Sequence, residues 1–454
     1  MWSSGRVSSR PARSAAPIVD PTVTEPIPVL EQRPRWRDTV SALRAHNYRL
    51  YLLGQVFANT GGWMARIAID WLVLELTGNV ALVGLAVTLQ FAPTLLLGPW
   101  AGVISDRFRR HSVLIATQSV GTIANAVLAV LVLTGAIAAW HVFVVAGVTG
   151  VSMAIDGPSR SAFVAEMVGT HRLRNAISIN ATIFHLGGLL GPAISGVLIV
   201  LVGSGVSIAI NAGTSLVAVL ALVLMRRHEL IAVARTPAAP GQIREALRYL
   251  VRKPTILWPM VVLASVAIFG MNLPVLFTAA ANEGYHTGAA GYGLYSSLAA
   301  VGAFIGAILS TRRRALRLRA IVGAAILYGV VTMLAGVAPI VLVFLGALVG
   351  IGITRVTFAT GAESLTQLST NLAIRGRIMS FYLMTVVGGQ ALGGVLMGAI
   401  AESFGPTVAF VVAGGVPALT ATTVAIVLAR RGRLGLTFAL PWRGRFVRIV
   451  PRAI

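Results

Sequence analysis

The sequence predicts an all-α integral membrane protein with twelve transmembrane helices, arranged as two pseudo-symmetric six-helix bundles. Three observations support this fold: an apolar composition, a series of apolar stretches of helix length, and an internal repeat. Of the 454 residues, 56% are hydrophobic and only 11% are charged. Soluble domains are about 45–50% apolar and about 25% charged, so this composition excludes a soluble enzyme.

From Tyr48 onward, apolar stretches of about 20 residues follow one another. As helices, such stretches are long enough to cross ~30 Å of hydrocarbon. A polar segment, 227–254, separates six of them from the other six and predicts a short helix over 242–251. The predicted spans are 48–76, 80–105, 112–135, 140–165, 174–202, 204–226, 255–280, 289–311, 317–338, 340–363, 376–404 and 405–430.

The spans divide the chain into five parts. Residues 1–46 lack the apolar core of a secretory signal peptide, and we expect a disordered cytoplasmic N-terminal tail. An N-terminal bundle (47–226), a cytoplasmic central loop (227–254), a C-terminal bundle (255–430) and a basic cytoplasmic C-terminal tail (431–454) complete the organisation.

Basic residues mark every second connection between the spans. The net charge is +23, from 37 basic and 14 acidic residues, and every basic residue except Arg66 and Arg355 lies in a tail, in the central segment, in an alternate connection or near the span end beside one of these. Because arginine and lysine concentrate in cytoplasmic loops, this pattern predicts a multi-pass protein of the cell membrane with both termini cytoplasmic. It does not predict nucleic-acid binding, which requires a basic cluster on a soluble surface.

The two halves repeat one another. Glycines 188, 191 and 196 in the fifth span correspond to glycines 389, 393 and 398 in the eleventh. Internal repeats of this kind are typical of transporters whose substrate site lies between halves that rock about the membrane midplane. The repeat therefore predicts a site at the interface of the two bundles.

The segment 98–110 predicts a gate at the cytoplasmic end. Gly98 and Gly102, four residues apart, allow another helix to approach closely. Asp106 is placed to accept hydrogen bonds from the N-terminus of a neighbouring helix, whose dipole favours an anion. The arginines that follow either set the topology, as we expect for Arg109, or pair with acidic groups when the gate closes. Arg355 is interpreted as a member of an inner-gate ion pair, with Glu363 or Asp156 as its partner, in preference to a substrate ligand. The residues predicted for this gate and its ion pairs are Gly98, Gly102, Asp106, Arg107, Arg110, Asp156, Arg160, Glu166, Arg355 and Glu363.

Three ionisable residues inside spans are candidates for proton coupling. Arg66 and Asp70 lie four apart on one helix face and can pair. Intramembrane ionisable groups usually mark a pathway, so Asp70 is either a proton-coupling carboxylate or half of a structural pair near the outer surface. His185 either shuttles a proton or is a hydrogen-bonded packing residue.

The remaining polar and aromatic residues near the midplane predict a substrate cavity. The candidates are Gln90, Asn180, Phe184, Asn272 and Gln390. The chain has no cysteine, no phosphate-binding Gly-x-x-x-x-Gly-Lys-Ser/Thr motif and no histidine–glutamate cluster. We therefore expect no enzyme activity, no cofactor, no metal and no ATP-driven pumping by this chain.

Over residues 45–430 the chain resembles the major facilitator superfamily, above all at Gly98–Arg110, which is similar to the superfamily's motif between its second and third helices. The segments 62–66, 70–78, 156–169 and 191–193 resemble a bacterial drug and siderophore efflux branch that includes enterobactin-exporter-like proteins and transmembrane secretion effectors. That branch often has an arginine before its Gly-Pro in the fifth helix. Here Gly187 and Gly188 stand in its place, which counts against export of an anion.

The resemblance implies a secondary active transporter that exports a small apolar or amphipathic compound by alternating access, in exchange for protons. Its expected partners are this small-molecule substrate, protons and the lipid bilayer, and we expect a monomer. Two alternatives stay open: a siderophore or metabolite exporter without a drug role, and a non-transporting membrane partner that retains the fold.

Overall fold

The computed structural model describes residues 27–28, 41–231, 242–311, 315–316, 318–371, 374–431, 434–438 and 447–451. Within these ranges the protein is helical apart from two short antiparallel strand pairs. Strand β1 (Ile27–Pro28) pairs with β2 (Ala315–Leu316), and β3 (Leu434–Phe438) pairs with β4 (Val447–Pro451). The predicted N-terminal tail lies largely outside the described residues, as do parts of the central loop and the C-terminal tail.

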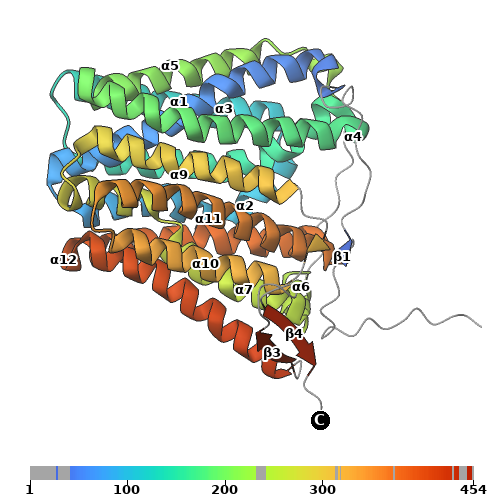
Figure 1. Cartoon of the computed structure of the whole chain (residues 1–454). Helices are drawn as coiled ribbons and strands as arrows, with labels where there is room; N and C mark the ends of the chain where they lie inside the picture. The colour runs from blue at the N-terminus through green and yellow to red at the C-terminus, as the bar shows by residue number, and fades with distance from the viewer. Residues whose placement is uncertain are drawn as a thin grey trace, which may run out of the picture.

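The helices lie side by side along one common direction (Figure 1). They are α1 (His46–Thr77), α2 (Val80–Arg107), α3 (Arg110–Leu133), α4 (Ala139–Val202), α5 (Ser204–Val223), η2 (Arg227–Glu229), α6 (Gln242–Arg252), α7 (Pro254–Ser265), η3 (Val266–Gly270), α8 (Leu273–Ala279), η4 (Ala280–Gly284), α9 (Gly288–Thr311), α10 (Leu318–Gly336), α11 (Val341–Leu368) and α12 (Arg375–Arg431). Helix α6 confirms the short helix predicted in the central loop.

Glycines break the two longest helices. In α4 the break is at Gly169, with φ 71°, and in α12 it is at Gly405, with φ 80°. Positive φ is open to glycine because it has no Cβ, and the proline after Gly405 removes a further backbone donor. Each break lies between two predicted spans, so α4 and α12 each run along the molecule twice.

The helical body has two ends. The tail end is the end at which α1 begins and α12 finishes, and the far end is the opposite one (Figure 1). Successive helices alternate in direction, so α1 reaches the far end at Thr77 and α2 leaves it at Val80. Ten stretches of the described chain are long and apolar enough to cross a membrane, and the molecule is a multi-pass membrane protein. The charged helix α1 is not among these ten.

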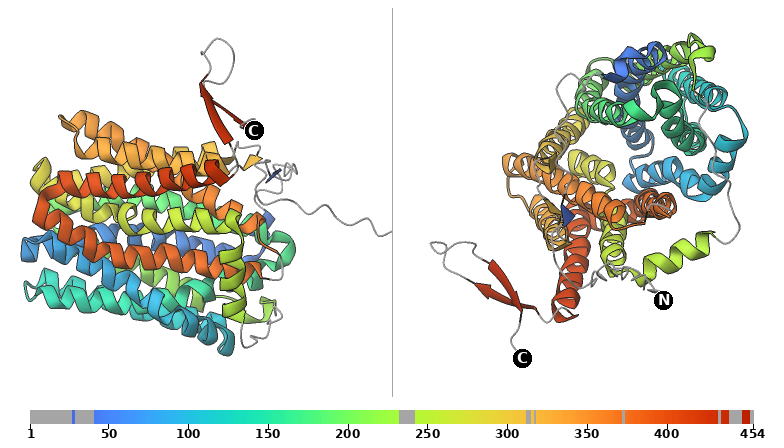
Figure 2. Two further views of the ribbon diagram at one scale, coloured as in Figure 1. Left: turned by 90° about the horizontal axis from the view of Figure 1, so that it is seen from below. Right: turned by 90° about the vertical axis from the view of Figure 1, so that its right-hand side faces the viewer.

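Helices α1–α5, the N-terminal helices, pack on one another, as do α7–α12, the C-terminal helices. Seen from the tail end, the two groups lie on different sides of the molecule (Figure 2, right). Two contacts dominate between the groups: α2 packs along α12, and α4 packs along α9. The interface predicted from the repeat is therefore formed chiefly by these four helices.

The predicted span 255–280 is interrupted in the structure. The chain passes from α7 into the π-helical segment η3, then into α8 and a second π-helical segment, η4. Asn272 stands between η3 and α8 with φ −87° and ψ 40°, and Pro274 follows it. Pro274 has no amide donor for the carbonyl of Gly270, four residues earlier, which explains a break that apolar periodicity does not predict. Single π turns occur often at functional sites.

Candidate transport site and gates

A buried hydrogen bond joins the two groups of helices near the far end. The side chain of Asp70 on α1 is 0% exposed, and its Oδ2 accepts a hydrogen bond of 2.8 Å from the hydroxyl of Tyr292 on α9. Its second oxygen, Oδ1, is buried without a donor. Such an atom is costly in an apolar environment, so a proton on Oδ1 would relieve the cost.

Arg66 does not pair with Asp70, contrary to the predicted pairing. Its guanidinium group lies over the rings of Trp63 and Phe91, 5.1 Å from each centroid. Long helical side chains point back toward the N-terminus, which turns Arg66 toward Trp63 and away from Asp70. The burial of Asp70 also contradicts the alternative of a hydrated carboxylate at the outer surface.

Further contacts close the far end between α2 and α12. The carboxylate of Glu402 accepts a 2.7 Å hydrogen bond from the amide of Val80, the first residue of α2. The Thr88 hydroxyl donates to the carbonyl of Ala391 at 2.6 Å and accepts from the amide of Val395 at 3.1 Å. An anion at a helix N-terminus is favoured by the free amides and the dipole, so Glu402 caps α2 from the opposite group.

Glycines bring backbones together at the same end. A Cβ at Gly293 on α9 would lie 2.7 Å from the Cα of Gly196 on α4, and one at Gly398 would lie 3.1 Å from the Cα of Gly84. Beyond the spans, burial raises the pKa of the Tyr285 hydroxyl, which donates to the carbonyl of Ala338 at 3.2 Å. Together these contacts close the molecule at its far end.

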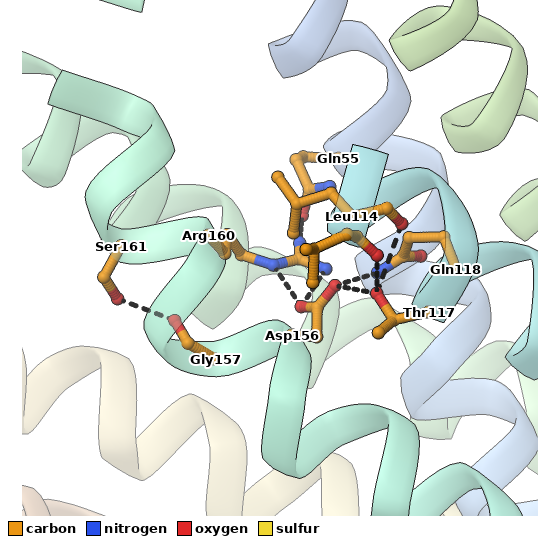
Figure 3. Close-up of polar contacts among 9 residues, drawn as sticks. Gln55, Leu114, Thr117, Gln118, Asp156, Gly157, Arg160 and Ser161 are labelled. Atoms are coloured by element: carbon orange, nitrogen blue, oxygen red, sulfur yellow. Dashed lines mark hydrogen bonds and ion pairs between the residues drawn. The ribbon is translucent and has the colours of Figure 1, made fainter. Parts of the chain in front are cut away.

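Asp156 forms the centre of a polar cluster inside the N-terminal helices (Figure 3). Its carboxylate pairs with Arg160, one turn along α4, at 2.6 Å, and it accepts from Gln118 at 2.8 Å and Thr117 at 3.2 Å. Arg160 also donates to the amide oxygen of Gln55 on α1. The cluster therefore ties α1, α3 and α4 to one another.

The segment 98–110 is described in part. Arg110 forms a 2.6 Å ion pair with Glu166 on α4, whereas the side chains of Arg107 and Arg109 are exposed. The side chains of Asp106 and Gly102 lie outside the described residues. A Cβ at Gly98 would meet nothing within 4 Å, so the predicted close approach at Gly98 is wrong for this structure. The close approach of α2 occurs instead at Gly84, toward the far end.

Arg355 has neither of the carboxylate partners that were predicted for it. Asp156 is paired with Arg160, and Glu363 accepts from Gln367 at 3.2 Å. Eight residues of helix separate Arg355 from Glu363 by about 12 Å, beyond the reach of an ion pair. The Nε of Arg355 is buried without a hydrogen-bond partner, and its charge acts on His185 of α4.

The predicted cavity residues fall in different surroundings. Asn180 accepts a 3.2 Å hydrogen bond from Tyr48 inside the N-terminal helices. Phe184 packs edge-on against Trp63, with ring centroids 5.5 Å apart. Gln90 has a buried amide nitrogen without a partner, and buried Asn272 has a free Oδ1. Gln390 is partly exposed on α12.

Sequence reasoning missed three features of the far-end closure. Tyr292 lies 222 residues from Asp70, and no local pattern announces their contact. Thr88 could not be singled out, because many residues with a hydroxyl group occur in the apolar helices. Glu402 could have been found, because it is a carboxylate at the outer end of the predicted span 376–404. In addition, Gly187 and Gly188 leave room for the ring of Trp63, which lies 3.2 Å and 3.3 Å from a Cβ built at each.

Comparison with known proteins places this geometry in a family. The family model described as "Transmembrane secretion effector" matches residues 37–434. The chain is 27% identical to the multidrug efflux pump Tap of Mycolicibacterium fortuitum, over 85% of this chain and 97% of Tap. It is 25% identical to the enterobactin exporter EntS of Citrobacter koseri, over 84% and 92% of the two chains. A match to the staphyloferrin A transporter of Staphylococcus aureus, at 29% identity, spans 31% of this chain and 35% of that protein.

Solved structures agree on the fold. A crystal structure of a POT family transporter in complex with a thioalcohol-conjugated peptide superposes with a TM-score of 0.70, over 85% of this chain and 96% of that one, at 12% identity. A D-xylose–proton symporter gives a TM-score of 0.64 over 83% and 96%, at 14% identity. Because the family model covers most of its length, the chain belongs to the transmembrane secretion effector family, a family of major facilitator superfamily (MFS) transporters.

Proposed function

We propose that this transporter is a proton-coupled exporter that moves a small apolar or amphipathic compound out of the cell by alternating access. It would cross the cell membrane twelve times: the ten apolar stretches, α1, and the second passage of α12. The two groups of helices then form two six-helix bundles around a substrate site. In this arrangement the tail end is cytoplasmic and the far end is external.

The hydrogen bond between Asp70 and Tyr292 is the observation that carries the proposal. It links a titratable group to the contact that closes the external end. Opening that end separates the two residues and exposes Asp70 to the outside, where Oδ1 takes a proton. Closure then buries the neutral acid against Tyr292, and loss of the proton to the cytoplasmic side leaves a charge that burial disfavours. The bundle therefore closes with a proton and reopens without one, and the proton gradient supplies the energy with no cofactor.

The relatives support export as the direction of transport. Tap is named a multidrug efflux pump and EntS an enterobactin exporter. The siderophore names among the relatives favour a second candidate, export of a siderophore or metabolite. Substrate-dependent proton flux separates both candidates from a membrane partner that kept the fold and lost transport.

Accumulation of dyes, antibiotics and siderophores in an efflux-deficient host tests the proposal. Cells expressing the wild type should accumulate less of at least one compound, and a protonophore should abolish the difference. Asp70→Asn should raise accumulation to the level of the empty host, because an amide cannot release a proton. Glu75→Gln is the matched control: Glu75 is an exposed carboxylate on the same helix, five residues away. Efflux by Asp70→Asn equal to that of the wild type would overturn the proton-coupling role.

Reporter fusions test the membrane orientation. Fusions at residues 140, 285 and 404, all at the far end, should report an external location. Fusions at 108 and 230 should report a cytoplasmic one, since arginines concentrate at the tail end. A cytoplasmic signal at any of the three far-end positions contradicts the topology.

A further inference from the structure

The guanidinium group of Arg66 lies against two aromatic rings of the protein. The rings of Trp63 and Phe91 lie 5.1 Å from the guanidinium carbon, and the structure gives Arg66 no hydrogen bond or ion pair with any described residue. An arginine has five N–H donors around its edge, and none of them is used here. The aromatic contacts fix the group in place while its edge stays available to an acceptor.

The position of Arg66 faces the interface between the two groups of helices. Asp70 contacts α9, and Arg66 lies one helical turn from Asp70. Arg66 therefore lies on the face of α1 that is directed toward α9. Phe91 on α2 lies between Thr88 and Leu95, both of which contact α12. The arginine is therefore held between α1 and α2 on the surfaces that meet the C-terminal helices.

Arg355 is a second guanidinium group without a carboxylate. It lies halfway along α11, is partly exposed, and has a buried Nε with no partner. It interacts electrostatically with His185 on α4 and Tyr328 on α10. The hydroxyl of Tyr328 donates to the carbonyl of Gly270, so it offers Arg355 no anion.

A row of contacting side chains runs from Arg66 on α1 to His185 on α4, and the link from His185 to Arg355 is electrostatic. Arg66 stacks on Trp63, Trp63 packs edge-on against Phe184 at 5.5 Å, and His185 follows Phe184 in the chain. The charge of Arg355 acts on His185 from the opposite group of helices. One line of aromatic and cationic groups therefore runs from α1 to α11 with no carboxylate paired to either arginine.

Unpaired guanidinium groups are disfavoured inside a membrane, and such groups usually line a path for something of opposite charge. We propose that the exported compound is an organic anion with a flat aromatic or other apolar body. This reverses the expectation drawn from Gly187 and Gly188, because the two arginines supply positive charge at other positions of the interface. Arg66 and Arg355 each bind a negatively charged group of the compound, and Trp63 and Phe184 pack on its body. This inference rests on the proposed export function and names the chemical class of its substrate.

Binding of three matched probes to the purified full-length chain tests the proposal. The probes are 1-naphthoate, 1-naphthalenemethanol and 1-naphthylmethylammonium, which share a ring system and differ in charge. Calorimetric titration should give saturable binding of naphthoate about tenfold tighter than that of the alcohol, as expected for charge-assisted hydrogen bonds, with the cation weakest. Equal affinities, preference for the cation, or no saturable binding of naphthoate would each overturn the proposal.

Two variants and a control assign the effect to residues. Because naphthoate carries one carboxylate, at least one of Arg66→Gln and Arg355→Gln should weaken its binding by about tenfold, and neither should change binding of the alcohol. Arg226→Gln, on the exposed tail-end surface, should bind as the wild type does. Thermal unfolding of each variant checks that it is folded. Unchanged naphthoate binding in both Arg66→Gln and Arg355→Gln overturns the assignment.

The same measurement separates this inference from the proposed function. Binding is recorded without a proton gradient, so it does not depend on coupling. Asp70→Asn should lose efflux and retain the preference for naphthoate. If the wild type binds naphthoate selectively but shows no proton-dependent efflux, the export mechanism fails while the anion site stands.

Discussion

At the scale of single residues, the cluster around Asp156 shows how a charged pair is kept inside a membrane protein. The carboxylate receives hydrogen bonds from Thr117 and Gln118 and an ion pair from Arg160, so both of its oxygens are satisfied. A buried ion pair is tolerated when further hydrogen bonds complete it, and it is costly to break. Arg160 in turn donates to Gln55, so the cluster joins residues of α1, α3 and α4 and holds these N-terminal helices together.

Removal of Arg160 should therefore destabilise the protein more than removal of the whole pair. Arg160→Gln leaves the Asp156 carboxylate with two neutral donors, at a cost of about 3 kcal/mol, the lower end for a buried pair. The low end applies because the Arg160 side chain is 28% exposed. Thermal unfolding of the purified protein should show a midpoint several degrees below that of the wild type. The double variant Asp156→Asn/Arg160→Gln should recover part of this loss; a midpoint equal to that of Arg160→Gln would contradict the explanation.

The partners of individual residues were predictable only where they are local. The pairing of Arg110 with Glu166 follows from two helix ends at the tail end that carry opposite charges, and the sequence suggests it. The bond between Asp70 and Tyr292 depends on the packing of α1 against α9, and sequence spacing cannot indicate it. Arg66 had two candidate neighbours at helical spacing, Trp63 and Asp70. Helical side chains lean toward the N-terminus of their helix, so Arg66 contacts Trp63.

At the scale of elements, glycines control how closely the two groups of helices approach. Gly196 and Gly293 let α4 and α9 touch at the backbone near the far end. Gly84, Gly394 and Gly398 do the same for α2 and α12. Small residues permit such contact in membranes, where helices associate through close packing. Gly196 and Gly398, one from each repeat, thus mark the interface, whereas the other four repeated glycines pack against helices of their own group.

A larger side chain at one of these glycines should hold the far end open. Gly293→Leu places a Cβ 2.7 Å from the Cα of Gly196 and 2.8 Å from the carbonyl oxygen of Pro192, so the helices must separate. Overpacking of this kind costs about 1–3 kcal/mol. The reaction of an introduced Ala81→Cys with an impermeant maleimide should become severalfold faster. Gly323→Leu, where a Cβ meets nothing within 4 Å, is the control, and equal rates in the two variants would contradict this role.

The helices themselves were largely predictable from the sequence, but only some of the breaks inside them were. Apolar length and flanking arginines located the elements, and Gly-Pro at 405–406 gave the turn inside α12. The passage through η3 and η4 was missed because residues 255–280 are apolar throughout and periodicity does not distinguish α from π turns. Pro274 and Asn272 were the available signal for this break.

At the scale of the whole molecule, the structure shows one end of a transport cycle. Asp70, Glu402, Thr88 and the paired glycines all join the two groups of helices toward the far end. The predicted gate at Asp106 lies at the opposite end, on the last turn of α2. At the far end a carboxylate, Glu402, caps the N-terminus of α2, and the sequence predicts that Asp106 does the same for a neighbouring helix at the tail end. For Asp106 this arrangement remains a prediction from the sequence.

If the two carboxylates hold opposite ends of the same pair of helices, loss of one should shift the population toward the state held by the other. The chain has no cysteine, so spin labels can be placed in the native background. Phe108→Cys with Leu368→Cys reports the tail end, and Trp140→Cys with Val337→Cys reports the far end; all four side chains are exposed. Asp106→Asn should increase the fraction of molecules with a short far-end distance and a long tail-end distance, whereas Glu402→Gln should do the reverse. A substitution shifts the equilibrium between the two conformations only if it changes the free energy of one conformation more than that of the other. Because α2 and α12 are continuous through the interface, the two distances should change in opposite directions in every variant. Independent changes of the two distances would show that the ends are not coupled, and alternating access through these helices would then be wrong.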